Sequence, residues 1–61
     1  MRQKDLIKMI EKDGWYVFRS GDNIQQFRHT LKMGIITIYG NSHDAVANYS
    51  INSIIDKAGL R

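Results

Sequence analysis

The chain has 61 residues, of which 43% are hydrophobic and 25% charged, and it contains neither cysteine nor proline. This length accommodates one domain, and the missing cysteines exclude a disulfide framework, a thiolate zinc site and a cysteine nucleophile. No apolar run reaches the roughly 20 residues that span a bilayer, and no signal-peptide core follows the charged start. We therefore expect one domain over residues 1–61, located in the cytoplasm and not bound to a membrane.

The charge balance favours a polyanionic partner. Nine Lys and Arg residues against six Asp and Glu residues give a net charge of +3 and a sequence pI near 9.5. An excess of this size is compatible with RNA binding, but it also occurs as ordinary solvated surface charge. The distribution of the basic residues over the folded chain distinguishes RNA binding from ordinary surface charge.

The first element is an expected helix over residues 4–13. Leu6, Met9 and Ile10 have the i, i+3 and i+4 spacings of an amphipathic helix. Gly14 then closes the helix, because glycine readily adopts the left-handed conformation found just past a helix C-terminus.

Three extended segments follow the helix. Residues 15–19 are rich in aromatic and β-branched side chains and are followed by turn-forming residues at 20–23. Residues 24–31 and 35–39 supply two further strands, and the connection over 32–34 is short enough for a hairpin. The pattern predicts a three-stranded antiparallel meander.

Side chains alternate between the two faces of a strand, so strand parity predicts which residues face the core. In the third strand, Ile36 and Ile38 are expected to face inward. The second strand is expected to direct one set of side chains to the core: Gln25, Phe27, His29 and Leu31. It directs the other set to the opposite face: Ile24, Gln26, Arg28 and Thr30.

Residues 40–49 are polar and predict a surface loop, with Ser50 as the N-cap of a final helix. Gly59 is expected to end this helix, and Leu60 to make the apolar contact that accompanies a glycine cap. Four apolar residues at i, i+3, i+4 and i+7 form the stripe of a helix packed on a sheet: Ile51, Ile54, Ile55 and Ala58. The expected fold is α+β, in the order α-β-β-β-α, with both helices on one sheet face, as in a double-stranded-RNA-binding domain.

Two histidines are the candidates for metal-independent proton transfer near neutral pH. Strand parity turns His29 toward the helices, where a structural role is the simpler interpretation. His43 lies in a polar loop beside Asp44, which can orient the imidazole, although a plain surface histidine is the alternative. Trp15 and Tyr39 offer rings for base stacking, as does Tyr16, but strand aromatics in small domains belong mostly to the core.

The remaining polar residues show no pattern that binds a metal or a cofactor. The carboxylates have no metal-ligand spacing, and the glycines are isolated, so no phosphate-binding loop is present. We therefore expect no metal and no small-molecule cofactor.

Several strings, in their order and spacing, resemble the HicA family, the small toxins of HicBA toxin-antitoxin pairs. Residues 5–15 are similar to the opening helix of the family with its closing Gly-Trp. Arg19, followed eight residues later by Phe-Arg-His at 27–29, resembles the family's Arg and Phe-Lys-His positions. Residues 36–38 resemble its third strand, and residues 50–60 its last helix, which commonly ends in Ala-Gly-Leu.

The resemblance implies a double-stranded-RNA-binding-like fold, cleavage of messenger RNA and a HicB antitoxin that covers the active surface. In the family, cleavage depends on a histidine in a Gly-Ser-His motif at the start of the second strand. Here the aligned residues are Asp22, Asn23 and Ile24, so Ile24 occupies the catalytic position. The proline-containing loop that precedes the last helix in the family is also missing.

Two functions therefore stay open. The first is an mRNA-cleaving toxin that binds RNA through Arg19, Arg28 and Lys32, with His29 or His43 as the proton-transfer group. The second is a catalytically silent module of the same fold that binds RNA or a HicB-like antitoxin, with the residue at position 24 in an apolar contact patch. A third, more general interpretation is an interaction domain without RNA affinity, whose basic excess serves solubility.

Overall fold

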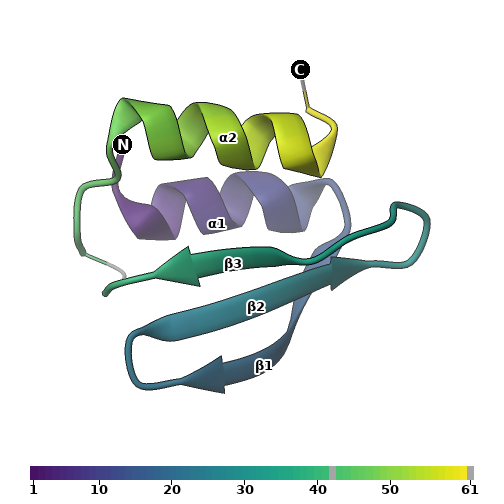
Figure 1. Cartoon of the computed structure of the whole chain (residues 1–61), viewed down its shortest axis with the longest axis horizontal. Helices are drawn as coiled ribbons and strands as arrows, with labels where there is room; N and C mark the ends of the chain where they lie inside the picture. The colour runs from purple at the N-terminus through teal and green to yellow at the C-terminus, as the bar shows by residue number, and fades with distance from the viewer. Residues whose placement is uncertain (42, 61) are drawn as a thin grey trace.

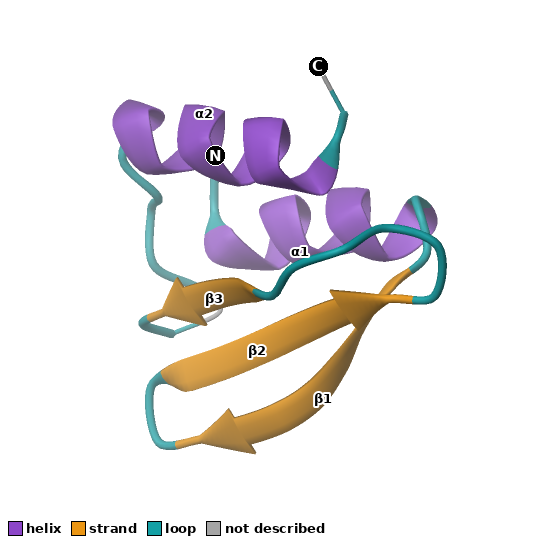
Figure 2. Ribbon diagram, turned by 45° about the vertical axis from the view of Figure 1, so that its right-hand side comes forward, coloured by secondary structure: helices purple, strands orange, loops and turns teal. Residues whose placement is uncertain are grey.

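The computed structural model of the chain describes residues 1–41 and 43–60. Two helices form one layer over a three-stranded antiparallel sheet and leave the other face of the sheet uncovered (Figures 1 and 2). The α+β fold and the element order expected from the sequence are confirmed. The elements, in chain order, are α1 (Gln3–Lys12), β1 (Trp15–Gly21), β2 (Ile24–His29), β3 (Ile36–Tyr39) and α2 (Asn48–Ala58).

The hairpin between β1 and β2 is tighter than the sequence predicts. β1 continues to Gly21, two residues beyond its expected end, and only Asp22 and Asn23 form the turn. Asn23 has a φ of 61°, and asparagine is one of the few residues besides glycine that adopt this left-handed conformation readily. The strands therefore pair up to Gly21 and Ile24, in the order β1-β2-β3.

The second strand ends at His29, and the prediction that Leu31 faces the core is wrong. The Leu31 side chain is 88% exposed. The ladder stops at the pair between Trp15 and His29, because β1 begins at Trp15 and offers no partner beyond it. The backbone N–H groups of Leu31 and Lys32 instead turn back to the His29 ring.

The core lies between the sheet and the two helices. Trp15 and Phe27 are its largest side chains, and the expected inward orientation of Ile36 and Ile38 is confirmed, since each is at most 3% exposed. Full burial of an apolar side chain of this size contributes about 1.5–3 kcal/mol to folding. Leu6, Ile10 and Ala58 supply the buried residues of the helices.

The last helix starts three residues before the predicted position. Its N-cap is Ala47, in an extended conformation, and the carbonyl of Ala47 accepts the N–H groups of Ser50 and Ile51. Ser50 therefore lies inside the first turn. The predicted C-terminus is confirmed, because Gly59 has a φ of 72° and Leu60 donates its N–H to the Ile55 carbonyl and packs against the core.

The loop between β3 and α2 is attached to the start of α1. The Gln3 N–H donates to the Asp44 carbonyl at 2.9 Å, and the Gln3 side-chain amide donates to the Tyr39 carbonyl at 2.7 Å. Arg2 and Ala45 form an antiparallel bridge beside these bonds. The polar side chain of Gln3 is buried because it satisfies this loop, which a helical periodicity cannot reveal. Within the described residues, neither helix has the length and apolar character to cross a bilayer.

Candidate functional site

The uncovered face of the sheet presents side chains from all three strands. Phe27 faces the core, so alternation places Gln26 and Arg28 on the open face, as the sequence predicts. The register adds the side chains paired with them across the sheet. The open face is defined here by eight residues: Tyr16, Phe18, Arg19, Ile24, Gln26, Arg28, Thr37 and Tyr39.

Two features of this face stand out. Its aromatic rings are accessible, with Tyr16 47%, Phe18 39% and Tyr39 74% exposed, whereas Trp15 is in the core. Its two charged side chains, Arg19 and Arg28, are both cationic. An arginine and aromatic surface of this kind suits a polyanion that carries planar groups.

A β-bulge in β1 creates part of this surface. Val17 pairs with Phe27 and Arg19 pairs with Gln26, so Phe18 is an extra residue in the ladder. The Arg28 guanidinium carbon lies 5.3 Å from the centre of the Phe18 ring, which places Phe18 on the open face beside Arg19. Two consecutive side chains thus point the same way, and strict alternation along the sequence misses this arrangement.

Ile24 lies on the open face, as strand parity predicts. It begins β2, where it pairs with Gly21 on one side and with Tyr39 on the other, and it is half-buried between its neighbours. Its aliphatic side chain neither accepts nor donates a proton.

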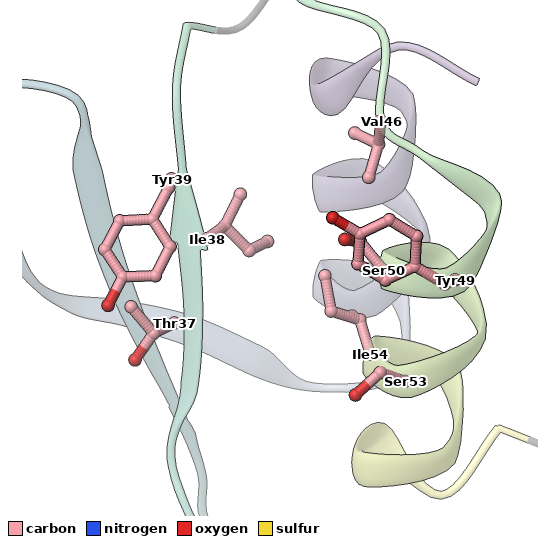
Figure 3. Close-up of a pocket in the computed structure, with 8 residues that line it drawn as sticks. All are labelled: Thr37, Ile38, Tyr39, Val46, Tyr49, Ser50, Ser53 and Ile54. Atoms are coloured by element: carbon pink, nitrogen blue, oxygen red, sulfur yellow. The ribbon is translucent and has the colours of Figure 1, made fainter.

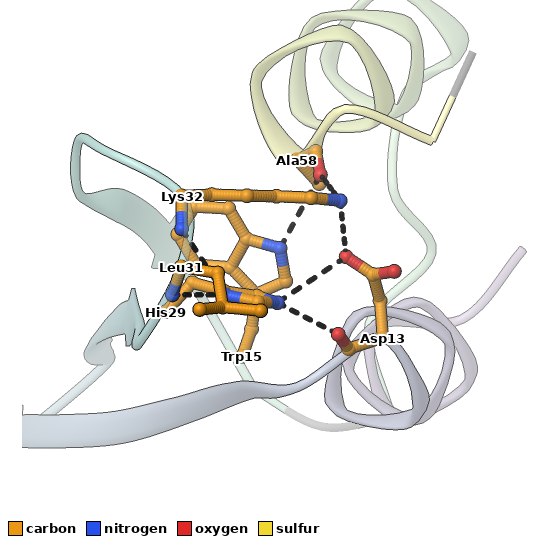
Figure 4. A network of polar contacts seen from close by, with 6 residues as sticks. All are labelled: Asp13, Trp15, His29, Leu31, Lys32 and Ala58. Carbon is orange, nitrogen blue, oxygen red and sulfur yellow. Dashed lines mark hydrogen bonds and ion pairs between the residues drawn. The ribbon is translucent and has the colours of Figure 1, made fainter.

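His29 faces the opposite way, into the layer of the helices, and its side chain is 6% exposed. Its Nε2 lies 2.7 Å from the Asp13 carbonyl, while its Nδ1 accepts the N–H groups of Leu31 and Lys32 at 2.9 and 3.3 Å (Figure 4). This pattern corresponds to the tautomer that carries its proton on Nε2. The Trp15 ring and the imidazole pack edge to face, with 5.3 Å between their centroids. Both ring nitrogens thus serve the fold.

The structure separates Lys32 from the two arginines with which the sequence groups it. The Lys32 ammonium donates to the Asp13 carboxylate at 2.5 Å and to the Ala58 carbonyl at 2.8 Å (Figure 4). It therefore caps the C-terminus of α2, where a cation also interacts favourably with the helix dipole. A hollow of about 380 Å³ at the end of β2 is lined by its side chain together with those of Tyr16 and Arg28.

His43 is exposed in the loop that follows β3. Its carbonyl accepts a hydrogen bond from the Arg2 guanidinium at 2.6 Å, so the loop lies against the start of α1. The Asp44 carboxylate accepts the Asn41 N–H. Because the loop leaves the sheet after Tyr39, which pairs with Ile24, His43 belongs to the Ile24 end of the sheet.

A second hollow, of about 320 Å³, separates β3 from α2 (Figure 3). Ile38 points into it from the strand, whereas the side chains of Thr37 and Tyr39 lie on the other side of β3. From α2 it receives Ile54 and three hydroxyl-bearing residues, Tyr49, Ser50 and Ser53. None of the described residues that line it is charged. Among residues 1–41 and 43–60, no group of three or more His, Asp or Glu side chains is placed to hold a metal ion.

The Asp13 carboxylate gives the helix-side network a pH dependence. The hydrogen bond from Lys32 lowers the pKa of Asp13 and the charge of Lys32 lowers it further, while desolvation opposes the shift. A carboxyl group with a lowered pKa in the folded state stabilises the fold above its unfolded pKa of about 4, and this stabilisation is lost as the pH falls through the folded value.

We expect Asp13→Asn to remove this acid-sensitive part of the stability. The melting temperature of Asp13→Asn should lie below that of the unmodified chain at pH 7, and the two should converge as the pH falls below about 4. Thermal unfolding followed by circular dichroism over this range measures the difference. Glu11→Gln, which removes an exposed carboxylate from α1 just before Asp13, controls for the change in net charge. A constant difference at all pH values would contradict the role of Asp13.

The chain matches a family model over nearly all of its length. No curated protein matches the chain. The model of one family, described as HicA toxin of bacterial toxin-antitoxin, matches residues 4–60 and therefore spans both helices and all three strands. The chain thus belongs to the HicA toxin family, the toxin components of bacterial toxin-antitoxin systems, and the partner that this membership implies is an antitoxin.

Proposed function

We propose that the chain binds messenger RNA on the open face of its sheet, as the toxin of a pair with a HicB-like antitoxin. The observation that supports this is the charge of the face, where Arg19 and Arg28 lie together and none of the eight side chains is acidic. Arginine binds phosphate through a planar, permanently charged group, and phosphate contacts supply most of the sequence-independent affinity for nucleic acid.

Outside the open face, basic and acidic side chains of the described residues are more evenly matched. The two helices carry both lysines and carboxylates, so their excess of positive charge is smaller than that of the open face with its two arginines. Outside α1 and α2, Asp13, Asp22 and Asp44 lie in connections between elements. The charged residues within α1 and α2 are Lys4, Asp5, Lys8, Glu11, Lys12, Asp56 and Lys57.

RNA binding is tested by the fluorescence anisotropy of a labelled single-stranded RNA at several salt concentrations. We expect the affinity to fall as salt rises, with a contribution of about 0.7 to the log-log slope from each phosphate contact on a single strand. Arg19→Gln and Arg28→Gln should each weaken binding by about 3- to 10-fold and reduce the slope by about 0.7.

Lys8→Gln is the matched control, because it removes an exposed cation from α1 on the covered side of the sheet. It should leave the slope unchanged. Equal losses in all three variants would contradict a site on the open face. Absence of salt-dependent binding by the unmodified chain would contradict RNA binding itself.

RNA cleavage is the second candidate function, and the position of His43 favours it over cleavage by His29. By the family resemblance, Ile24 occupies the position of the catalytic histidine, and the loop of His43 leaves the sheet at the same end. An exposed imidazole there can take the proton of a ribose 2′-hydroxyl. That oxygen then attacks the adjacent phosphorus, and the departing 5′-oxygen takes a proton from water.

The binding experiment also distinguishes these functions. The RNA recovered from metal-free samples is run on a denaturing gel. Intact RNA identifies a binding module without cleavage. Cut RNA with the unmodified chain and intact RNA with His43→Ala would establish cleavage with His43 as the proton-transfer group.

A further inference from the structure

The open face holds a compact group of three side chains that the binding of phosphate does not explain. Tyr16 and Phe18 are two residues apart in β1 and share this face. Arg28 is paired with Tyr16 across the ladder, and its guanidinium lies over the Phe18 ring at 5.3 Å. The Arg28 side chain thus starts opposite Tyr16 in the ladder and carries its cation over the Phe18 ring.

The fold does not bury these rings. Trp15 and Phe27 fill the core at 2% and 1% exposure, whereas Tyr16 and Phe18 keep 47% and 39% of their surface in contact with solvent. The bulge in β1 brings Arg19 to the same side as Phe18, and bulges often redirect side chains next to functional sites. The result is a contiguous aromatic surface with cations and no carboxylate among the residues that form it.

The chemistry of this surface matches an unpaired nucleobase. A base of a single strand has free π-faces that stack on aromatic rings and on the guanidinium plane of arginine. In an A-form duplex the bases are stacked on one another, so a protein reaches mainly phosphates and 2′-hydroxyls. The hollow of about 380 Å³ beside Tyr16 and Arg28 extends the surface past the end of β2 and leaves room for the sugar and phosphate of a stacked nucleotide.

We propose that Tyr16, Phe18 and Arg28 form a stacking platform that makes the open face selective for single-stranded RNA. This inference rests on the proposed function, since it assigns the base-binding part of the same site. Arg28 has two roles in it: it holds the Phe18 ring by a cation–π contact and neutralises a neighbouring phosphate.

The test separates ring stacking from phosphate binding. Phe18→Leu and Tyr16→Leu remove a ring and keep an apolar side chain, while Tyr49→Leu is the matched control because its ring is 80% exposed on α2. We expect each of the first two variants to bind a short single-stranded RNA about 5- to 100-fold more weakly, with the salt slope unchanged. Tyr49→Leu should bind like the unmodified chain.

Two further ligands sharpen the result. An abasic ribose-phosphate strand of equal length and a duplex of the same sequence offer phosphates without accessible base faces. The unmodified chain should bind both ligands more weakly than it binds the single strand. Phe18→Leu should bind each of them as tightly as the unmodified chain does. Phe18→Trp adds a spectroscopic signal, since single-stranded RNA should quench the fluorescence of the new indole and the abasic strand should not.

The outcomes distinguish this inference from the proposed function. Salt-dependent RNA binding that both leucine variants retain in full would overturn the platform and leave RNA binding in place. Equal affinity for single-stranded, abasic and duplex ligands would do the same. Failure of the unmodified chain to bind any of the three would overturn both. If one leucine variant does not fold, as judged by circular dichroism, the other variant decides.

Discussion

His29→Ala is expected to lower the free energy of unfolding by about 2–3 kcal/mol. The substitution removes the acceptor of two backbone N–H groups, the bond to the Asp13 carbonyl and the ring packed on Trp15. Loss of a buried partner costs about 1–3 kcal/mol, and the cavity beside the indole adds to it. A chain of this size has a total stability of only about 3–9 kcal/mol, so the variant should lose a large fraction of its stability.

Urea denaturation of His29→Ala and His43→Ala side by side measures this effect. His43 is exposed, so its removal should change the stability by less than about 0.5 kcal/mol. His29→Asn should recover part of the loss, because its side-chain oxygen can accept the same backbone N–H groups. Equal stability of His29→Ala and the unmodified chain would refute the structural role. The result also determines how the cleavage assay is interpreted. If a His29 variant does not fold, its loss of activity gives no evidence that His29 is catalytic.

Gly14→Ala is expected to have an effect at least as large, about 3 kcal/mol or more. Gly14 has a φ of +111°, and a Cβ atom there would lie 2.8 Å from Nε2 of His29. The backbone strain costs about 1–3 kcal/mol, and the contact adds an overpacking term of similar size. The ring cannot move aside without breaking the bonds at both of its nitrogens. The melting temperature should fall by at least about 12 °C.

Gly34→Ala separates the two causes. Its φ of +96° is similar, but apart from its own chain neighbours no described residue has an atom within 4 Å of the Cβ it would gain, so only the backbone term remains. The melting temperature of Gly14→Ala should therefore lie well below that of Gly34→Ala. The double variant Gly14→Ala/His29→Ala should be less destabilised than the sum of its parts, because removal of the ring relieves the contact. Strict additivity would refute a clash between the two residues.

Local pattern was sufficient for much of the fold. Helical spacing located α1 and the apolar stripe of α2, and strand alternation placed Phe27 and His29 toward the helices and Ile24 and Arg28 on the open face. These features follow from the backbone geometry of an isolated element, so residue spacing alone reveals them.

The predictions that were wrong depend on partners remote in the sequence. Leu31 leaves the core because β1 offers no partner there, and the final helix begins before Ser50 because the preceding loop is attached to α1. The end of a neighbouring strand leaves no periodic pattern in the sequence. Hydrogen bonds between segments about 40 residues apart leave none either.

The candidate site divides in the same way. The sequence by itself determined the parity of β2, and with it that Arg28 shares the open face with an isoleucine where the family resemblance expects a histidine. Only the tertiary structure decided that the bulge brings Arg19 onto the face of Phe18 and Arg28 and that Lys32 caps a distant helix instead of joining the arginines. Parity is a property of one strand, whereas a bulge is defined by the register between two strands and a cap by the packing of the layers.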